Sequence, residues 1–451
     1  MSQKLGSKSI FKKTTNNDSL FSGVWIRWNH LTVPEKVVFA NIILIPAWWA
    51  IGIYRFMAAL IFFGIAWYEQ KNYGRIQFKK PSLSAMALFL YSSYRLIGSI
   101  FYDLATGNQL NIREDIRYIF FWYGLILLLW YIQSNNIRVR LEVVAWALSL
   151  LVIQMIVFWV IGEVILGGRD YIYPRTIFSL LARNAEGNYQ HGAGFSNYLI
   201  PYIPHNTSIA GLKRWSFFFI IPEIFALVAA YINLVSLDIK NRLWSILLFT
   251  GSFFLVLVSG TRSVWLLLPV ILILRYTFIF GRIWGYALPL ALLAIISFTT
   301  LSFPSVTDYF LDIYDSQVEA VGEFRADSTE VRSEIYKLTL EAIPDKLIFG
   351  HWITGPIILP GFELGRVGTH SFILGSLLYH VGIVGTLMFL TFWILFAAWL
   401  YQTRKGRPPS VFLLLILYTL LSTVMEFGEL IACMLVLLAV IIDSPMNKNS
   451  N

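Results

Sequence analysis

Charge is scarce in this sequence. Only 14% of its 451 residues are Asp, Glu, Lys or Arg, whereas 57% are hydrophobic, and the mean hydropathy is +0.65. A soluble domain carries about a quarter charged residues, so the composition excludes an ordinary soluble protein and indicates a polytopic membrane protein. The net charge of +9 does not indicate nucleic-acid binding, because the basic residues are scattered over short connections between apolar runs.

Several chemical signatures are also missing. Cys433 is the single cysteine, so no internal disulfide can form. The six histidines include no H-x-x-x-H pair and no Cys/His cluster, so we expect no metal site. The sequence has no Walker-type loop and no G-x-G-x-x-G before a helix, so nothing in it supports nucleotide-driven transport, and we expect no cofactor.

Long apolar runs recur along the chain. They lie at about 36–53, 56–68, 83–101, 116–132, 141–166, 215–235, 243–260, 263–281, 283–303, 372–401, 411–425 and 429–443. In lipid the backbone must satisfy its own hydrogen bonds, so we expect an all-α protein of about twelve transmembrane helices. Residues 34–445 would then form one integral-membrane domain between tails at 1–33 and 446–451.

Basic residues are unequally distributed between the connections at the two ends of the expected helices. With the N-terminus inside, the inner connections hold thirteen: Lys71, Arg75, Lys79, Lys80, Arg138, Arg140, Lys240, Arg242, Arg275, Arg282, Arg404, Lys405 and Arg407. The short outer connections hold four: Arg55, Arg113, Arg117 and Arg262. Because positive charge concentrates in cytoplasmic loops, both termini are expected to be cytoplasmic. The two long connections, at about 167–214 and 304–369, are expected to be external.

The connection between the ninth and tenth spans is predicted to contain a helix. Asp327 can cap it, with Glu330 completing a capping box, and Ile343-Pro344 can end it. The apolar residues that recur at helical spacing, and so predict a packed face, are Val331, Ile335, Leu338 and Ala342.

Arginines gather at the predicted outer boundary. Arg262 lies at a break between two apolar runs, Arg332 lies on the external helix, and Arg95 lies inside the third span. Guanidinium groups bind phosphate oxygens in a bidentate way, so these residues predict a site for a phosphorylated amphiphile whose tail the bundle would hold. Further candidates are Arg55, Arg113, Arg117 and Arg366.

Structural readings of the same arginines stay open. Arg262 can extend to lipid phosphates at the membrane surface, and Arg95 can pair with a buried acid, for which Glu223 in the sixth span is the candidate. His370, at the N-terminal end of an expected helix, is a candidate base, because the helix dipole and nearby arginines disfavour its charged form. Its structural reading is a polar residue bonded to loop backbone.

Three stretches resemble, in order and spacing, motifs of the O-antigen ligase and polymerase superfamily of bacterial membrane glycosyltransferases. They are Ser259-Gly-Thr-Arg262-Ser, Arg332 with Pro344, Leu347 and Gly350 after it, and His370-Ser-Phe with Gly382 and Gly385 after it. The resemblance covers about residues 35–445. The sequence departs from the family's pattern at Ser371, where Asn is usual, at His380, where an acid is common, and at His351, where Gly is frequent.

The resemblance implies a metal-independent transferase on the outer face of the cytoplasmic membrane. The donor would be a glycan on undecaprenyl pyrophosphate, with Arg262 and Arg332 on the pyrophosphate and His370 as the base for the acceptor hydroxyl. Arg95 is a further expected ligand, and Glu223 an additional site residue. The partners would be the lipid-linked oligosaccharide, a glycan or lipid acceptor, membrane lipids and other polysaccharide-assembly proteins.

The sequence leaves the acceptor undetermined, so polymerisation and ligation of surface polysaccharide are both open. A protein O-oligosaccharyltransferase of the same superfamily is one alternative. A flippase or transporter of lipid-linked sugars is another, although the internal repeats typical of transporters are not found in the sequence.

Overall fold

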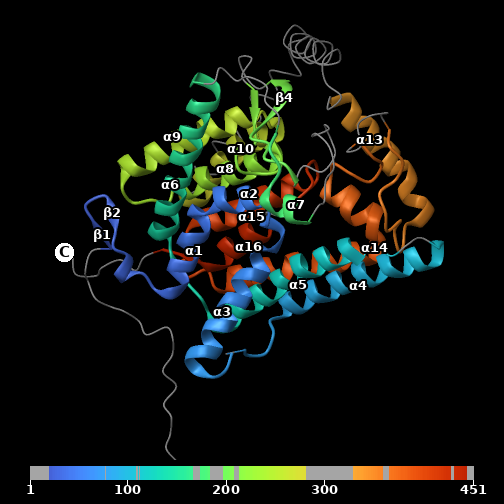
Figure 1. The fold of residues 1–451 in the computed structure, drawn as a ribbon, viewed down its shortest axis with the longest axis horizontal. Helices are drawn as coiled ribbons and strands as arrows, with labels where there is room; N and C mark the ends of the chain where they lie inside the picture. Colours follow the sequence, from blue (N-terminus) through green and yellow to red (C-terminus); the bar gives the residue numbers. More distant parts are fainter. Residues whose placement is uncertain are drawn as a thin grey trace, which may run out of the picture.

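Helices dominate the part of the chain that the structure describes (Figure 1). This computed structural model describes residues 20–76, 78–107, 110, 112–165, 173–182, 197–207, 213–280, 329–358, 365–427 and 431–443. The span expected at 283–303 and the tail at 446–451 lie outside these residues. Helices overlap every other expected apolar run, so the expectation of a mostly helical protein is confirmed.

The first half of the chain forms a run of helices. They are α1 (Val33–Ile43), α2 (Ile45–Ile51), α3 (Met57–Tyr73), α4 (Leu83–Thr106), α5 (Ile112–Asn135) and α6 (Leu141–Trp159), which continues as a π-helix over Val160–Ile165. A capping box starts α1: the Thr32 side chain accepts from the Glu35 N–H at 3.4 Å, and the Glu35 carboxylate accepts from the Thr32 N–H at 2.9 Å. Helices α1 and α2 meet at 58°, so the expected span at 36–53 is a bent pair.

The rest of the described chain adds further helices. They are α7 (Ile177–Ala182), α8 (Pro222–Ser236), α9 (Arg242–Ser259), α10 (Arg262–Phe280), α13 (Thr329–Ala342), the π-helix η7 (Phe372–Tyr379), α14 (His380–Gln402), α15 (Pro409–Leu421) and α16 (Ile431–Val440). As predicted, α13 ends before Ile343-Pro344, while its expected cap at Asp327 lies outside the described residues. The expected helix at 215–235 begins only at Pro222, because Ile221 before the proline is extended.

Five helical segments of the described chain are long and apolar enough to cross a membrane. The α1–α2 pair would make a sixth, and α8 and α15 are apolar but shorter. A chain with several such segments is a multi-pass membrane protein.

Helix α8 packs against α9, α15, α6 and α10 (Figure 1). Every residue from Ile224 to Ser236 is buried. A helix that is apolar all round is stable only when it is covered on every side. The position of its first turn, which carries Glu223, is therefore fixed by the packing of the rest.

The strands in the described residues form three short pairs. The pair β4 (Tyr202–Thr207) and β5 (Lys213–Trp215) is antiparallel, and β3 (Val139–Arg140) and β6 (Ile441–Ile442) are parallel. The third pair is β1 (Phe21–Ser22) with β2 (Trp25–Ile26). Strand β5 comes seven residues before α8 and brings the end of the first long connection to that helix.

The tenth expected span is interrupted. Inside α14, Gly382 has φ 64° and ψ −169°, so the helix breaks there. The break frees the Ile383 N–H, which donates to the Leu347 carbonyl at 2.9 Å. Gly350 has φ +80°, and a Cβ on it would lie 2.4 Å from the His380 carbonyl oxygen. The segment after α13 thus docks into the break, and a glycine on each side permits the contact.

Candidate functional site

One carboxylate holds two arginines from distant parts of the chain. Glu223 Oε1 lies 3.0 Å from Arg214 Nη2 on β5 and 3.0 Å from Arg332 Nη2 on α13. The side chains are 14%, 6% and 28% exposed, in that order. Two guanidinium groups on one carboxylate leave a local excess of positive charge, so the cluster attracts an anion.

The structural alternative in which Glu223 pairs with Arg95 is not what the structure shows. The first turn of α8 faces β5 and α13, so Glu223 binds the arginines of those two elements. The same contacts bring Arg332, a predicted site residue, next to Glu223, another one.

Arg214 also contacts the break between α9 and α10, which lies just before Arg262. Its Nε donates to the Ser259 carbonyl at 3.2 Å. Gly260 has φ +65°, and a Cβ there would lie 2.7 Å from Arg214 Cγ. Thr261 Oγ1 donates to the Pro222 carbonyl at 3.4 Å, so the break is bonded to the start of α8. A glycine is needed at position 260 because its φ is positive and because a Cβ there would collide with the Arg214 side chain.

Arg262 is the first residue of α10 and is exposed. The positive end of the helix dipole and the first backbone N–H groups lie beside its guanidinium. Each of these features favours an anion at this position. Since Gly260 packs on Arg214, Arg262 lies two residues from the cluster around Glu223.

His370 is held in an unusual backbone conformation just before η7. Its φ is +67°, which is uncommon for a residue other than glycine. Its Nδ1 lies 2.8 Å from Thr369 Oγ1, and that hydroxyl donates to the Arg366 carbonyl at 2.7 Å. The Tyr336 hydroxyl, one turn after Arg332 on α13, shares its one proton between the His370 carbonyl at 3.2 Å and the Val424 carbonyl at 3.1 Å. Helix α13 is thereby bonded to the histidine loop.

Residues 422–427, here called the 422–427 turn, follow α15. They connect the break before Arg262, helix α13 and the His370 loop. The turn accepts hydrogen bonds from all three motif regions: from Ser263 to Met425 Sδ at 3.2 Å, from Tyr336 to the Val424 carbonyl at 3.1 Å, and from Ser371 to the Thr423 carbonyl at 2.7 Å. The regions that carry Arg262, Arg332 and His370 therefore meet at one end of the bundle.

Arg95 lies deeper and has different neighbours. Its guanidinium carbon is 5.7 Å from the centre of the Tyr118 ring, and its electrostatic neighbours are Tyr91, Tyr118 and, last, Glu426 in the 422–427 turn. Glu426 accepts a short hydrogen bond from Ser376 on η7. Arg95 is thus an intramembrane charge with an acidic neighbour, although that acid is not the expected one.

Two other candidate arginines, Arg55 and Arg117, share a different acid, Glu114. Arg55 Nη1 is 3.3 Å from Glu114 Oε2, and Arg117 makes a short contact with the same carboxylate. These two arginines line a cavity of about 40 Å³ together with Thr176. The backbone of Arg366 pairs with Ile357.

Sequence reasoning missed Arg214 and Glu426. A signal for Arg214 was available, because Lys213-Arg214 stands in a predicted external connection, against the usual charge rule. For Glu426 the pattern offered only an acid between two short apolar runs. The residues that the structure describes contain no group of three or more His, Cys, Asp and Glu arranged to hold a metal ion.

Residues 245–390 match the family model described as O-antigen ligase. This stretch contains Arg262, Arg332 and His370. A search of curated proteins found no match to the chain. The family match confirms the resemblance seen in the motifs: over residues 245–390, this multi-pass membrane protein is similar to the O-antigen ligase family.

Proposed function

We propose that the protein transfers a glycan from an undecaprenyl-pyrophosphate carrier to an acceptor hydroxyl at the outer face of the cytoplasmic membrane. The reaction would polymerise or ligate a surface polysaccharide. Arg262 and Arg332 bind the pyrophosphate, and His370 accepts the proton of the acceptor hydroxyl. The observation that carries the proposal is the bonding of α13, the break before Arg262 and the His370 loop to one another through Glu223 and the 422–427 turn.

The hydrogen bonds around His370 suit a general base. The single hydroxyl proton of Thr369 goes to the Arg366 carbonyl, so the Thr369 oxygen accepts from His370 Nδ1–H. The neutral ring then carries its lone pair on Nε2. A neutral imidazole with a fixed tautomer is the form that accepts a proton in catalysis.

The chemistry follows from these assignments. The acceptor oxygen attacks the anomeric carbon and loses its proton to His370, while the bond from that carbon to the pyrophosphate oxygen breaks. Negative charge then builds on the departing pyrophosphate. Arg262, the first turn of α10 and Arg332 neutralise that charge, a role that guanidinium groups can fill without a metal ion.

The proposal includes the finer topology expected from the sequence. About twelve helices cross the membrane within residues 34–445, and both termini are cytoplasmic. The connections at 167–214 and 304–369 are external, which places Arg214 and Arg332 on the outer side. The charge asymmetry of the short connections supports this orientation.

The test is transfer by the purified full chain from a synthetic undecaprenyl-pyrophosphate glycan, with EDTA present. His370→Ala should lower the rate by roughly 10²–10⁴-fold while donor binding stays near normal. Arg262→Ala should weaken donor binding and transfer together. Arg242→Ala is the matched control, because Arg242 also begins a helix but lies at the predicted inner face.

Two outcomes would contradict the proposal. Full transfer by His370→Ala in EDTA would remove the base assignment. In cells, donor lipid stranded in the inner leaflet of a His370→Ala strain would indicate the flippase alternative, whereas stranding in the outer leaflet supports transfer. A protein product in place of a polysaccharide would indicate the protein O-oligosaccharyltransferase.

A further inference from the structure

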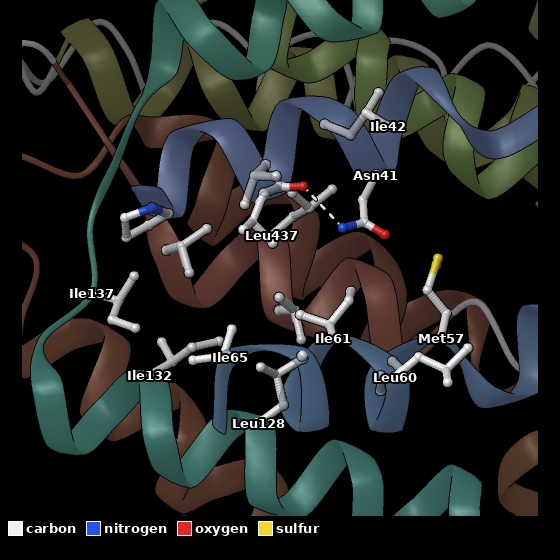
Figure 2. Close-up of a pocket in the computed structure, with 18 of the residues that line it drawn as sticks. Asn41, Ile42, Met57, Leu60, Ile61, Ile65, Leu128, Ile132, Ile137 and Leu437 are labelled. Carbon is white, nitrogen blue, oxygen red and sulfur yellow. Dashed lines mark hydrogen bonds between the residues drawn. The ribbon is translucent and has the colours of Figure 1, made fainter. Parts of the chain in front are cut away.

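An apolar cavity of about 490 Å³ lies between α1, α3, α5 and α16 (Figure 2). Figure 2 shows Ile42 of α1, Ile61 and Ile65 of α3, Leu128 of α5 and Leu437 of α16 around the same space. Its volume falls within the range of small-molecule pockets in proteins, about 300–1,000 Å³. The cavity is therefore large enough for a ligand rather than being a packing defect.

The cavity opens sideways, toward the surroundings of the bundle. Three of its lining residues, Val33, Leu60 and Tyr68, are 41–46% exposed, while Leu128 and Leu437 are buried. At Gly64 on α3, an added Cβ would meet no atom within 4 Å. The space between α1 and α3 is thus open to the surroundings of the bundle, which in a membrane protein include hydrocarbon chains.

Positive charge flanks one end of the cavity. Val33 and Val37 line it beside Lys36, and Tyr68 lines it three residues before Lys71. Lys36 lies 5.7 Å from the centre of the Trp28 ring. The same end holds two cations that already have partners, since Arg140 pairs with Glu35 at 2.6 Å and Arg138 lies over the Trp399 ring at 6.0 Å.

Two acids lie near this end, and both are buried and already have partners. Glu69, in the cavity wall, is 1% exposed and accepts a hydrogen bond from the Tyr131 hydroxyl at 2.7 Å. Glu35 is 2% exposed and bound by Arg140. An apolar slot that opens to lipid and has lysines at one end matches a lipid with hydrocarbon chains and an anionic head.

We propose that this cavity binds one acyl chain of an anionic phospholipid, with the phosphate of the headgroup near Lys36 and Lys71. Chain and protein are both apolar, so close packing in the slot holds the chain, and the lysines select the head. The site is separate from the cluster at Glu223, and the proposal does not depend on which glycan the protein transfers.

Native mass spectrometry of the detergent-purified full chain tests the proposal. Phosphatidylglycerol or phosphatidylcholine is added to the delipidated protein, and the bound lipid is counted. The wild type should retain one phosphatidylglycerol. Gly64→Phe fills the open space and should lower retention at least tenfold. Ala47→Phe, a small-to-large change at an exposed position outside the cavity, should retain the lipid like the wild type.

Two further variants make the outcome decisive. Lys36→Gln with Lys71→Gln should lose the preference for phosphatidylglycerol, roughly fivefold per lysine, and still bind a chain. Ile61→Trp fills the same cavity and replaces Gly64→Phe if that variant unfolds at a lower temperature. Unchanged retention in the folded cavity-filling variant overturns the proposal. So does displacement of phosphatidylglycerol by equimolar undecaprenyl phosphate, which would assign the cavity to the carrier.

Discussion

Replacing Gly382 by alanine tests whether the break in α14 holds the external segment in place. Gly382 has φ 64° and ψ −169°, a conformation that L-residues other than glycine reach only with strain of about 1–3 kcal/mol. The added Cβ would also lie 2.4 Å from the Ile348 carbonyl oxygen and 2.6 Å from the Gly350 N. Both of these are backbone atoms, so no side chain can turn away to make room.

The contact can be relieved only by moving the two backbones apart. That movement breaks the hydrogen bonds from Ile383 N to Leu347 O and from Trp352 N to His380 O, each 2.9 Å long. Each bond contributes about 1 kcal/mol net. Together with the strain, the expected loss of unfolding free energy for Gly382→Ala is about 3–5 kcal/mol.

The assay is thermal unfolding of the purified protein in detergent, followed by tryptophan fluorescence and far-UV circular dichroism. Gly64→Ala is the control, because Gly64 lies in a helix where a Cβ meets open space. That control should be neutral or slightly stabilising. If Gly382→Ala unfolds at the same temperature as Gly64→Ala, the break is not a constrained contact and the reasoning fails.

Three further predictions concern the charges. Glu223→Gln leaves the buried Arg214 and the half-buried Arg332 without their carboxylate and should cost about 3–5 kcal/mol of stability in thermal unfolding. The exposed Glu334→Gln should stay within about 0.5 kcal/mol, and equal effects of the two changes would refute the prediction. Lys337→Cys, in a Cys433→Ser background, should react with an impermeant maleimide in intact cells, and labelling only after lysis would reverse the orientation. Arg332→Lys keeps the charge but loses bidentate binding, so transfer should fall about a hundredfold, and near-normal transfer would make Arg332 structural.

The helices were the most predictable part of the fold. Long apolar runs can satisfy their backbone only as helices in lipid, so α4, α5, α6 and α9 were expected close to their observed bounds. Irregular stretches were less predictable. The start of α8 at Pro222 depends on one proline, and the break at Gly382 depends on docking of a segment more than thirty residues earlier in the chain.

The residue types of the candidate site could be predicted from the sequence, but the partner of each residue could be predicted only in part. Position along the chain and charge indicated Arg332 and Glu223 separately, but their contact depends on how α13 packs on α8. The structural alternative for Arg95 was a pairing with Glu223, because both stand in apolar runs, yet its acidic neighbour is Glu426. Hydropathy gives the depth of a residue in the membrane and not its angular position around the bundle, which decides such pairings.

The 422–427 turn has a consequence for chimeric proteins. The family match ends at residue 390. The 422–427 turn lies beyond that limit, yet it accepts the hydrogen bonds that connect the break before Arg262, helix α13 and the His370 loop. Glu223, the acid that binds Arg332, lies before residue 245. A stretch of 245–390 transplanted into a relative would have to find an equivalent acid and an equivalent turn in its new host. Exchange between such proteins should therefore succeed only when α8 and the region after α15 travel with the matched stretch.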